Sequence, residues 1–243
     1  MFFNQNIIFK QKTIEESAFD LCRRFYMSKN PFWRRTLKGF LKKDNPTLQD
    51  FKDRLKLEYN TKRPSTQMLD GIRTFWKNNE SIIVKELEGI FGDGKVVYQK
   101  VLCFLGMSPY MLVDYANSTI SFPIYNPLSE NINYFISFLI KYTIIDNLWD
   151  EDCLKINIAY SKDSAYWIMS DFVADAICYH SSLPCFAIKP AFPFYYSLVI
   201  KGENVIYKFR RLYKTMNIYD FMKYVLNYVQ SNASIFSQFT HRL

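Results

Sequence analysis

The stretch that most constrains the fold of this chain is residues 131–149, which read Asn-Ile-Asn-Tyr-Phe-Ile-Ser-Phe-Leu-Ile-Lys-Tyr-Thr-Ile-Ile-Asp-Asn-Leu-Trp. It is apolar on nearly every side, and Lys141 is its only charged residue before Asp146. A segment of this kind belongs inside a protein, and it is too short and interrupted for a membrane span, which needs about 20 mostly apolar residues. We expect a central buried helix. A pair of buried strands is the alternative, since periodicity cannot decide within an apolar run.

The composition is that of a folded protein with long regular elements. Of the 243 residues, 49% are hydrophobic and 18% aromatic, whereas Gly (7) and Pro (9) are scarce. This balance supports a substantial core and few loops. The five cysteines are spread along the chain with no secretory signal ahead of them, which favours reduced thiols and a cytoplasmic location. They are Cys22, Cys103, Cys153, Cys178 and Cys185.

Positive charge is concentrated in the first quarter of the chain. The net charge is +8; residues 1–63 carry 15 Lys and Arg against 7 Asp and Glu, whereas residues 64–243 carry 16 of each kind. Any attraction to an acidic partner therefore starts in the first segment. We expect a basic N-terminal helical layer, residues 1–63, followed by an α+β core, residues 64–243.

Helix and strand signals together predict the fold class. Thr13-Ile-Glu-Glu16 has the spacing of a capping box and predicts the start of a first helix, and Gly92 stands where a left-handed helix cap belongs. Apolar periodicity predicts further helices over 32–43, 47–62, 65–91 and 165–179, and a last helix after Asn217. Strands are predicted over 96–105, 119–124 and 154–160, with a C-terminal hairpin whose strands, 197–200 and 205–209, flank Lys201-Gly-Glu-Asn204. The expected class is α+β, predominantly helical with a small β-sheet.

Candidate chemistry gathers near residues 171–185. Asp171 and Asp175 lie one turn apart in a predicted helix, which would place two carboxylates on one face, as in a hard-cation site or an acid/base pair. His180 lies close to Cys178 and Cys185, so a thiol nucleophile or a zinc site is conceivable. The usual CxxC pairing is absent, and solvated carboxylates with ordinary buried cysteines explain the same residues.

The helix predicted over residues 32–43 has a basic face formed by Arg34, Arg35, Lys38 and Lys42. Such a face could meet phosphate, an anionic membrane surface or an acidic protein. Acidic residues are mixed in nearby and no nucleic-acid module accompanies it, so a merely solvated helix face is the alternative.

The order of features from about residue 70 to residue 183 carries a family resemblance. A helix reading Phe75-Trp76-Lys-Asn-Asn-Glu80 and Leu87-Glu-Gly-Ile-Phe-Gly92 precedes a strand and the segment Met107-Ser-Pro-Tyr110. A fairly polar strand, the apolar stretch and a helix reading Ser170-Asp-Phe-Val-Ala-Asp-Ala-Ile177 follow. This order, over about half the chain, resembles that of predicted bacterial zinc metallopeptidases of the zincin type. The resemblance implies a zincin-like core, with an acidic third ligand on the last helix.

The metal-binding motif of that family, HExxH, falls on Phe138-Leu-Ile-Lys-Tyr142 in this chain. Zinc needs two imidazoles one turn apart, with a Glu between them as general base, and Phe138, Leu139 and Tyr142 supply none of these groups. Asp171 alone would remain, and a single carboxylate cannot hold catalytic zinc. The resemblance therefore implies an inactive relative without metal or cofactor. Buried aromatic residues of an unrelated fold are the alternative.

Three functional interpretations follow from the sequence. The first is a catalytically inactive, metallopeptidase-like domain that acts as a protein-binding or regulatory module. The second is a nucleic-acid-associated protein that uses the basic residues of segment 1–63. The third is an enzyme of unrecognised type that uses Asp171, Asp175 and His180. In each case we expect no transmembrane segment.

Overall fold

The computed structural model of this chain describes residues 7–28, 31–62, 67–96, 101–114, 117–149, 165–183 and 193–240. The structure is mostly helical with a small mixed sheet, which confirms the α+β class. No helix within these ranges combines the length and the apolar character needed to cross a membrane. The strand predicted over 154–160, Cys153 and Cys185 lie outside the described residues.

The chain divides into two compact units. The first unit comprises Met1–Trp76 and Tyr98–Ile132, and the second comprises Lys77–Val97 and Asn133–Leu243. Two helices, α4 (Met68–Phe91) and α5 (Leu128–Trp149), contribute residues to both units. This division follows the packing of the chain, whereas the boundary predicted after residue 63 follows its charge and stays a prediction.

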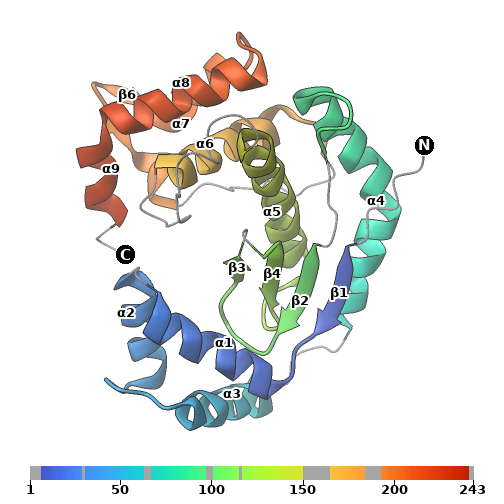
Figure 1. Cartoon of the computed structure of the whole chain (residues 1–243), viewed down its shortest axis with the longest axis vertical. Helices are drawn as coiled ribbons and strands as arrows, with labels where there is room; N and C mark the ends of the chain where they lie inside the picture. The colour runs from blue at the N-terminus through green and yellow to red at the C-terminus, as the bar shows by residue number, and fades with distance from the viewer. Residues whose placement is uncertain are drawn as a thin grey trace. The chain divides into compact units, whose positions relative to one another are not determined.

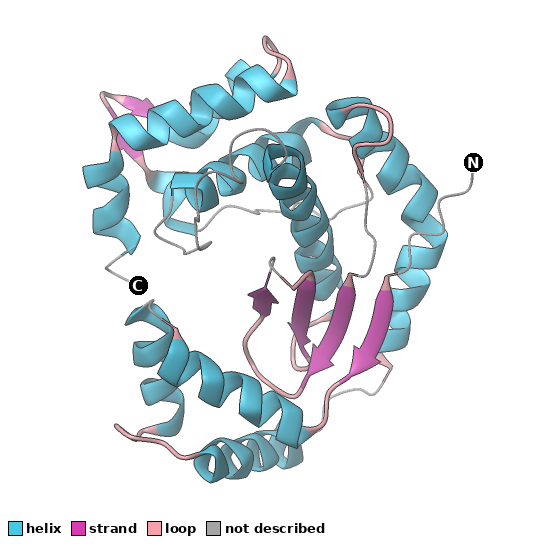
Figure 2. Ribbon diagram, in the orientation of Figure 1, coloured by secondary structure: helices cyan, strands magenta, loops and turns pink. Residues whose placement is uncertain are grey.

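The first unit contains a four-stranded sheet in the order β1-β2-β4-β3 (Figure 2). Strands β1 (Ile8–Gln11), β2 (Leu102–Gly106) and β4 (Thr119–Pro123) run parallel, and β3 (Leu112–Asp114) pairs antiparallel with β4. The structure confirms a strand in each of the regions 96–105 and 119–124. Strands β1 and β3 were not expected, because β1 exposes most of its side chains and β3 has only three residues, too few for a period-2 pattern to be recognised.

Three helices, α1 (Ile14–Met27), α2 (Pro31–Leu41) and α3 (Leu48–Lys62), form the helical layer of the first unit (Figure 1). The capping box is confirmed: the Glu16 N–H donates to the Thr13 hydroxyl over 3.1 Å, and the Thr13 N–H donates to the Glu16 carboxylate over 2.7 Å. Apolar side chains from the three helices and from β3 form one buried cluster. The cluster stabilises the layer because it removes apolar surface from water. Its members are Ala18, Leu21, Phe25, Trp33, Leu37, Phe51, Leu55 and Leu112.

The second unit is helical around α5 and α6 (Ala165–His180). The structure confirms α5 as one continuous helix, so the alternative of two strands is excluded. Helix α4 ends before Gly92, whose φ of 104° confirms the left-handed cap. The remaining described elements are η2 (Pro193–Ser197), β5 (Val199–Ile200), β6 (Glu203–Asn204), α7 (Val205–Tyr213), α8 (Ile218–Ser231) and α9 (Ala233–Thr240).

One predicted strand is wrong. The hairpin around Lys201-Gly202 exists, but each of its strands has only two residues, and residues 205–209 begin helix α7. The Asn204 side chain caps this helix by accepting the Tyr207 N–H over 3.1 Å. Val205, Ile206 and Phe209 are buried, and their spacing fits one helix face better than the alternation of a strand. The local cap and packing therefore override the β-propensity of this segment.

Candidate functional site

The α5 residues aligned with the HExxH motif are packed in the interior. Phe138 and Leu139 are buried, and the half-buried Tyr142 ring lies 5.9 Å from the Phe138 ring. The ammonium group of Lys141 forms a buried ion pair with the carboxylate of Asp171 on α6, and it also lies 5.7 Å from the ring of Trp167. A lysine cation therefore holds the one carboxylate that the resemblance offers as a metal ligand.

This donor set does not fit zinc. The aligned side chains of Phe138, Leu139 and Tyr142 offer neither imidazole nor carboxylate, and the ammonium group of Lys141 already binds the Asp171 carboxylate. Across the described ranges, no group of three or more His, Cys, Asp or Glu side chains is placed to hold a metal ion.

Asp175, one turn after Asp171 on α6, is held by Arg210 of α7. Its carboxylate accepts the Arg210 Nε–H over 2.8 Å and the Nη2–H over 3.0 Å, and it also accepts the hydroxyl of Tyr196. Burial alone would lower the pKa of Arg210, but the hydrogen bonds and the charge of Asp175 outweigh this and raise it. Asp175 is 2% exposed, so this bidentate pair is an internal link between α6 and α7.

His180, at the end of α6, contacts the same arginine. Its Nε2 lies 2.8 Å from the backbone oxygen of Arg210, and its ring stacks on Tyr213 with centroids 5.7 Å apart. Asp175 and His180 therefore both contact Arg210, whereas Asp171 forms its ion pair with Lys141. The enzyme hypothesis based on these three residues stays a prediction.

Of the predicted basic face, Arg34, Arg35 and Lys42 are exposed and Lys38 is half-buried, and Lys42 lies directly after the end of α2. Arg34, Arg35 and Lys42 form no ion pair with any described residue, whereas Lys38 binds Asp44 over 2.7 Å. Elsewhere in the helical layer, Asp20 binds Lys12, Asp50 binds Lys43, and Glu58 binds Arg54 and Lys62. Asp20, Asp44, Asp50 and Glu58 thus each bind a lysine or arginine nearby. The basic residues of the layer that form no ion pair with a described residue include Arg23, Arg34, Arg35, Lys42, Lys52 and Lys56.

An exposed apolar face on α1 was not predicted. The side chains of Phe19, Tyr26 and Met27 are 58%, 56% and 71% exposed, and the exposed Arg23 lies between them. Residues 19, 23, 26 and 27 fall on one side of a helix. A signal was present in the sequence, because these apolar residues fall outside the stripe of Ile14, Ala18, Leu21 and Phe25 that α1 buries. We call Phe19, Arg23, Tyr26 and Met27 the α1 face.

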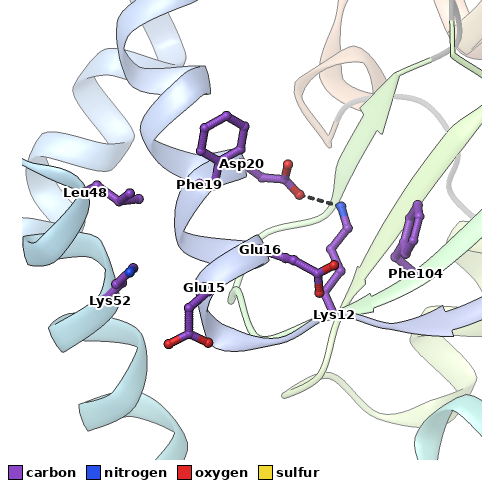
Figure 3. A pocket seen from close by; sticks show the side chains of 8 residues that line it. All are labelled: Lys12, Glu15, Glu16, Phe19, Asp20, Leu48, Lys52 and Phe104. Carbon is purple, nitrogen blue, oxygen red and sulfur yellow. Dashed lines mark hydrogen bonds and ion pairs between the residues drawn. The ribbon is translucent and has the colours of Figure 1, made fainter.

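A hollow lies at the N-terminal end of the α1 face (Figure 3). Figure 3 shows the Lys12 side chain between Asp20, its ion-pair partner, and the ring of Phe104, whose centroid is 4.3 Å from the ammonium nitrogen. The hollow has both apolar and charged walls, and Phe19 is part of its lining. The lining residues are Lys12, Glu15, Glu16, Phe19, Asp20, Leu48, Lys52 and Phe104.

The edge strand β3 is poorly suited to receive an additional strand. It is only three residues long, and Arg24 of α1 donates from Nη2 to the carbonyl oxygen of Val113 over 2.7 Å. A short edge whose carbonyl is occupied by a side chain resists strand addition. The α1 face is therefore a better candidate than the β3 edge of the sheet.

Comparison with known proteins adds no relative: the chain matches no protein-family model, no curated protein and no solved structure. The zincin resemblance accordingly stays a prediction.

Proposed function

We propose that this chain is a binding protein without metallopeptidase chemistry, which recognises another protein through the helical layer. The observation that carries the proposal is the α1 face, where Phe19, Tyr26 and Met27 expose more than half of their side chains. Scattered apolar residues on a surface need no explanation, but a group on one helix face indicates an interaction site. Aromatic residues and Met are also the types enriched in protein interfaces.

Charge supports an acidic partner surface. Arg23 lies within the α1 face, and Arg34 and Arg35 are exposed without an ion pair to any residue that the structure describes. Opposite charge on a partner would guide its approach and fix its orientation. The apolar side chains of the α1 face would supply most of the affinity, since desolvated aromatic and apolar anchors dominate binding energies.

The interior supports a non-catalytic role. If the zincin-like alignment is right, Lys141 has replaced the metal ion as the positive charge beside Asp171. An ammonium group can balance a buried carboxylate, but it cannot act as the Lewis acid that lowers the pKa of a bound water. The Lys141–Asp171 pair therefore balances the charge in the core but does not support hydrolysis by a metal-bound water.

Co-purification with the tagged full chain tests the proposal. We expect the wild-type chain to retain a defined protein from a lysate of the native cells, and the double variant Phe19→Asp/Met27→Asp to lose it. Ile82→Asp is the matched control, because Ile82 is 53% exposed on α4 and carries the same kind of change. Thermal unfolding followed by circular dichroism checks that all three chains are folded. Equal retention by all three chains, or none by the wild type, would contradict the proposal.

A second candidate function is nucleic-acid binding, which is favoured by the exposed arginines of α2. Each phosphate contact that is lost should reduce the slope of log K against log salt by about 0.9 for duplex DNA. The test compares the wild type with a variant in which Arg34, Arg35, Lys38 and Lys42 are all changed to Gln, using fluorescence anisotropy with a labelled duplex. An affinity for the duplex that changes neither with salt concentration nor with these four substitutions would exclude nucleic-acid binding by this face.

A further inference from the structure

Arg210 in the second unit is oriented more rigidly than a surface arginine usually is. Asp175 receives two parallel hydrogen bonds from its Nε and Nη2 atoms, over 2.8 and 3.0 Å, which fixes the plane of the guanidinium group. The third nitrogen, Nη1, donates to no residue in the part of the chain that the structure describes, and 15% of the side chain remains exposed. Two of the three guanidinium nitrogens are thus fixed by Asp175, and part of the Arg210 side chain remains accessible to solvent.

Two exposed tyrosines lie beside this guanidinium group. The ring centroid of Tyr179 on α6 lies 4.1 Å from the Arg210 guanidinium carbon, and that of Tyr207 on α7 lies 6.0 Å from it. Both distances are in the range of a cation–π contact. The two side chains are 59% and 66% exposed. Each of the two residues therefore keeps more than half of its surface accessible to solvent despite the contact with Arg210.

The Tyr179 ring is also supported by its neighbours on α6 and α7. The His180 ring lies edge-on to it, with centroids 4.8 Å apart, and stacks in turn on Tyr213. Aromatic side chains that are pre-oriented in this way lose little conformational entropy on binding. An arginine fixed among exposed tyrosines has the composition and rigidity of an interface hot spot.

Basic residues outnumber acidic ones on and directly after helix α7. Helix α7 carries Lys208, Arg210 and Arg211, and Lys214 follows it. The acidic side chains paired with these residues are Asp175, which is buried against Arg210, and Glu203, which binds Lys208 and Arg211. The surplus of positive charge favours a ligand that carries carboxylates.

We propose that Tyr179, Tyr207 and Arg210 form a docking site for an acidic peptide segment of a protein partner. The Nη1 edge of Arg210 would donate hydrogen bonds to a Glu or Asp carboxylate of the segment. A neighbouring apolar side chain of the same segment would pack on the exposed rings of Tyr179 and Tyr207. This site shares no residue with the α1 face and does not depend on the function proposed for that face.

The test is a selection of 12-residue peptides from a random display library against the full wild-type chain. We expect the selected peptides to be enriched in Asp and Glu next to an apolar residue. Synthetic copies should bind the Tyr179→Ser/Tyr207→Ser variant about 10-fold or more weakly than the wild type, as expected for the loss of hot-spot side chains. The tyrosines are changed rather than Arg210, because its loss would leave Asp175 buried without this partner.

Two controls separate this proposal from the one for the helical layer. The selected peptides should bind Phe19→Asp as tightly as the wild type, and Arg210→Lys should weaken them, since lysine keeps the charge but loses the planar group. The proposal is overturned if the selected peptides show no excess of Asp and Glu, if nothing is selected, or if the double tyrosine variant binds them as tightly as the wild type. Peptides whose binding is weakened by Phe19→Asp but not by the tyrosine changes would bind at the α1 face, and this result would also contradict the proposal.

Discussion

The helical layer of the first unit carries many charged residues and helix α6 of the second unit carries two aspartates, and these two regions place their charges very differently. In the layer, Arg23, Arg34 and Arg35 are exposed. On α6, Asp171 and Asp175 are buried, and each binds a basic side chain from another helix. Removing one member of a buried ion pair destabilises the fold, because the other charge stays buried without compensation. An exposed charge contributes little to stability and is available for binding.

The largest effect is expected where the buried pair of the second unit is broken. Lys141→Met leaves Asp171 buried without this ammonium group, which should lower the free energy of unfolding by about 3–5 kcal/mol. Urea denaturation followed by circular dichroism measures the change. Lys12→Met, which removes a more exposed pair with Asp20 in the first unit, should cost less than about 1 kcal/mol.

The double variant Lys141→Met/Asp171→Leu sharpens this comparison. Replacing both members of a buried ion pair by apolar residues is often neutral or stabilising, so it should recover most of the stability lost in the single variant. A cost under about 1 kcal/mol for Lys141→Met alone would show that the pair is not a structural element of the core.

The second largest contrast lies within the helical layer, between two phenylalanines. Phe51 is fully buried in the shared cluster, whereas Phe19 is 58% exposed. Phe51→Ala should lower the free energy of unfolding by about 3–5 kcal/mol because it leaves a cavity, and Phe19→Ala should change it by no more than about 0.5 kcal/mol. Similar losses in the two variants, measured by the same urea titration, would mean that the α1 face is part of the core.

A smaller, pH-dependent effect is expected at Asp50 of α3. Hydrogen bonds from Lys43 and from the N–H and hydroxyl groups of Thr47 lower the pKa of Asp50 from 3.8 to about 2. A carboxyl whose pKa is lower in the folded chain adds stability that is present above pH 3.8 and is lost as the pH falls through about 2. Asp50→Asn should therefore lower the thermal midpoint at pH 7 and have a much smaller effect near pH 2, where the Asp50 carboxyl is partly protonated. A difference that is the same at both pH values would refute this assignment.

The smallest effect is expected at the arginines of α2. Arg34 and Arg35 are exposed and form no ion pair with the residues described in the structure, so changing both to Gln should alter the free energy of unfolding by about 0.5 kcal/mol at most. Urea titration of this variant beside the wild type provides the measurement. A loss above about 1 kcal/mol would assign these side chains to the fold and weaken the case that they serve binding.

The sequence predicted the features that local patterns determine. Thr13 and Glu16 form a capping box, Gly92 adopts a left-handed cap, and α5 is a single helix, since each depends on residues that are close together in the chain. The pattern failed for residues 205–209, where β-branched residues suggested a strand but the Asn204 cap and packing against α6 favour a helix. Lys141 and Asp171 could not be paired from the sequence, because they are 30 residues apart and belong to different helices.

The candidate surfaces differ in how far the sequence could reveal them. Phe19, Tyr26 and Met27 fall outside the buried stripe of α1, so a helical projection of the sequence could have identified the α1 face. The contacts of Arg210 with Tyr179, Tyr207 and Asp175 depend on how α6 and α7 pack, and no sequence pattern predicts them. The sequence indicated Asp175 and His180 as candidate site residues. It did not indicate Arg210, which both of them contact.

The proposal that Lys141 stands in the place of a metal ion is tested most directly by the zinc content of the purified full chain, determined by mass spectrometry of the elements. We predict far less than one zinc per chain, and the same thermal midpoint with and without a chelator. One tightly held zinc per chain that is lost in the Asp171→Ala variant would contradict the account.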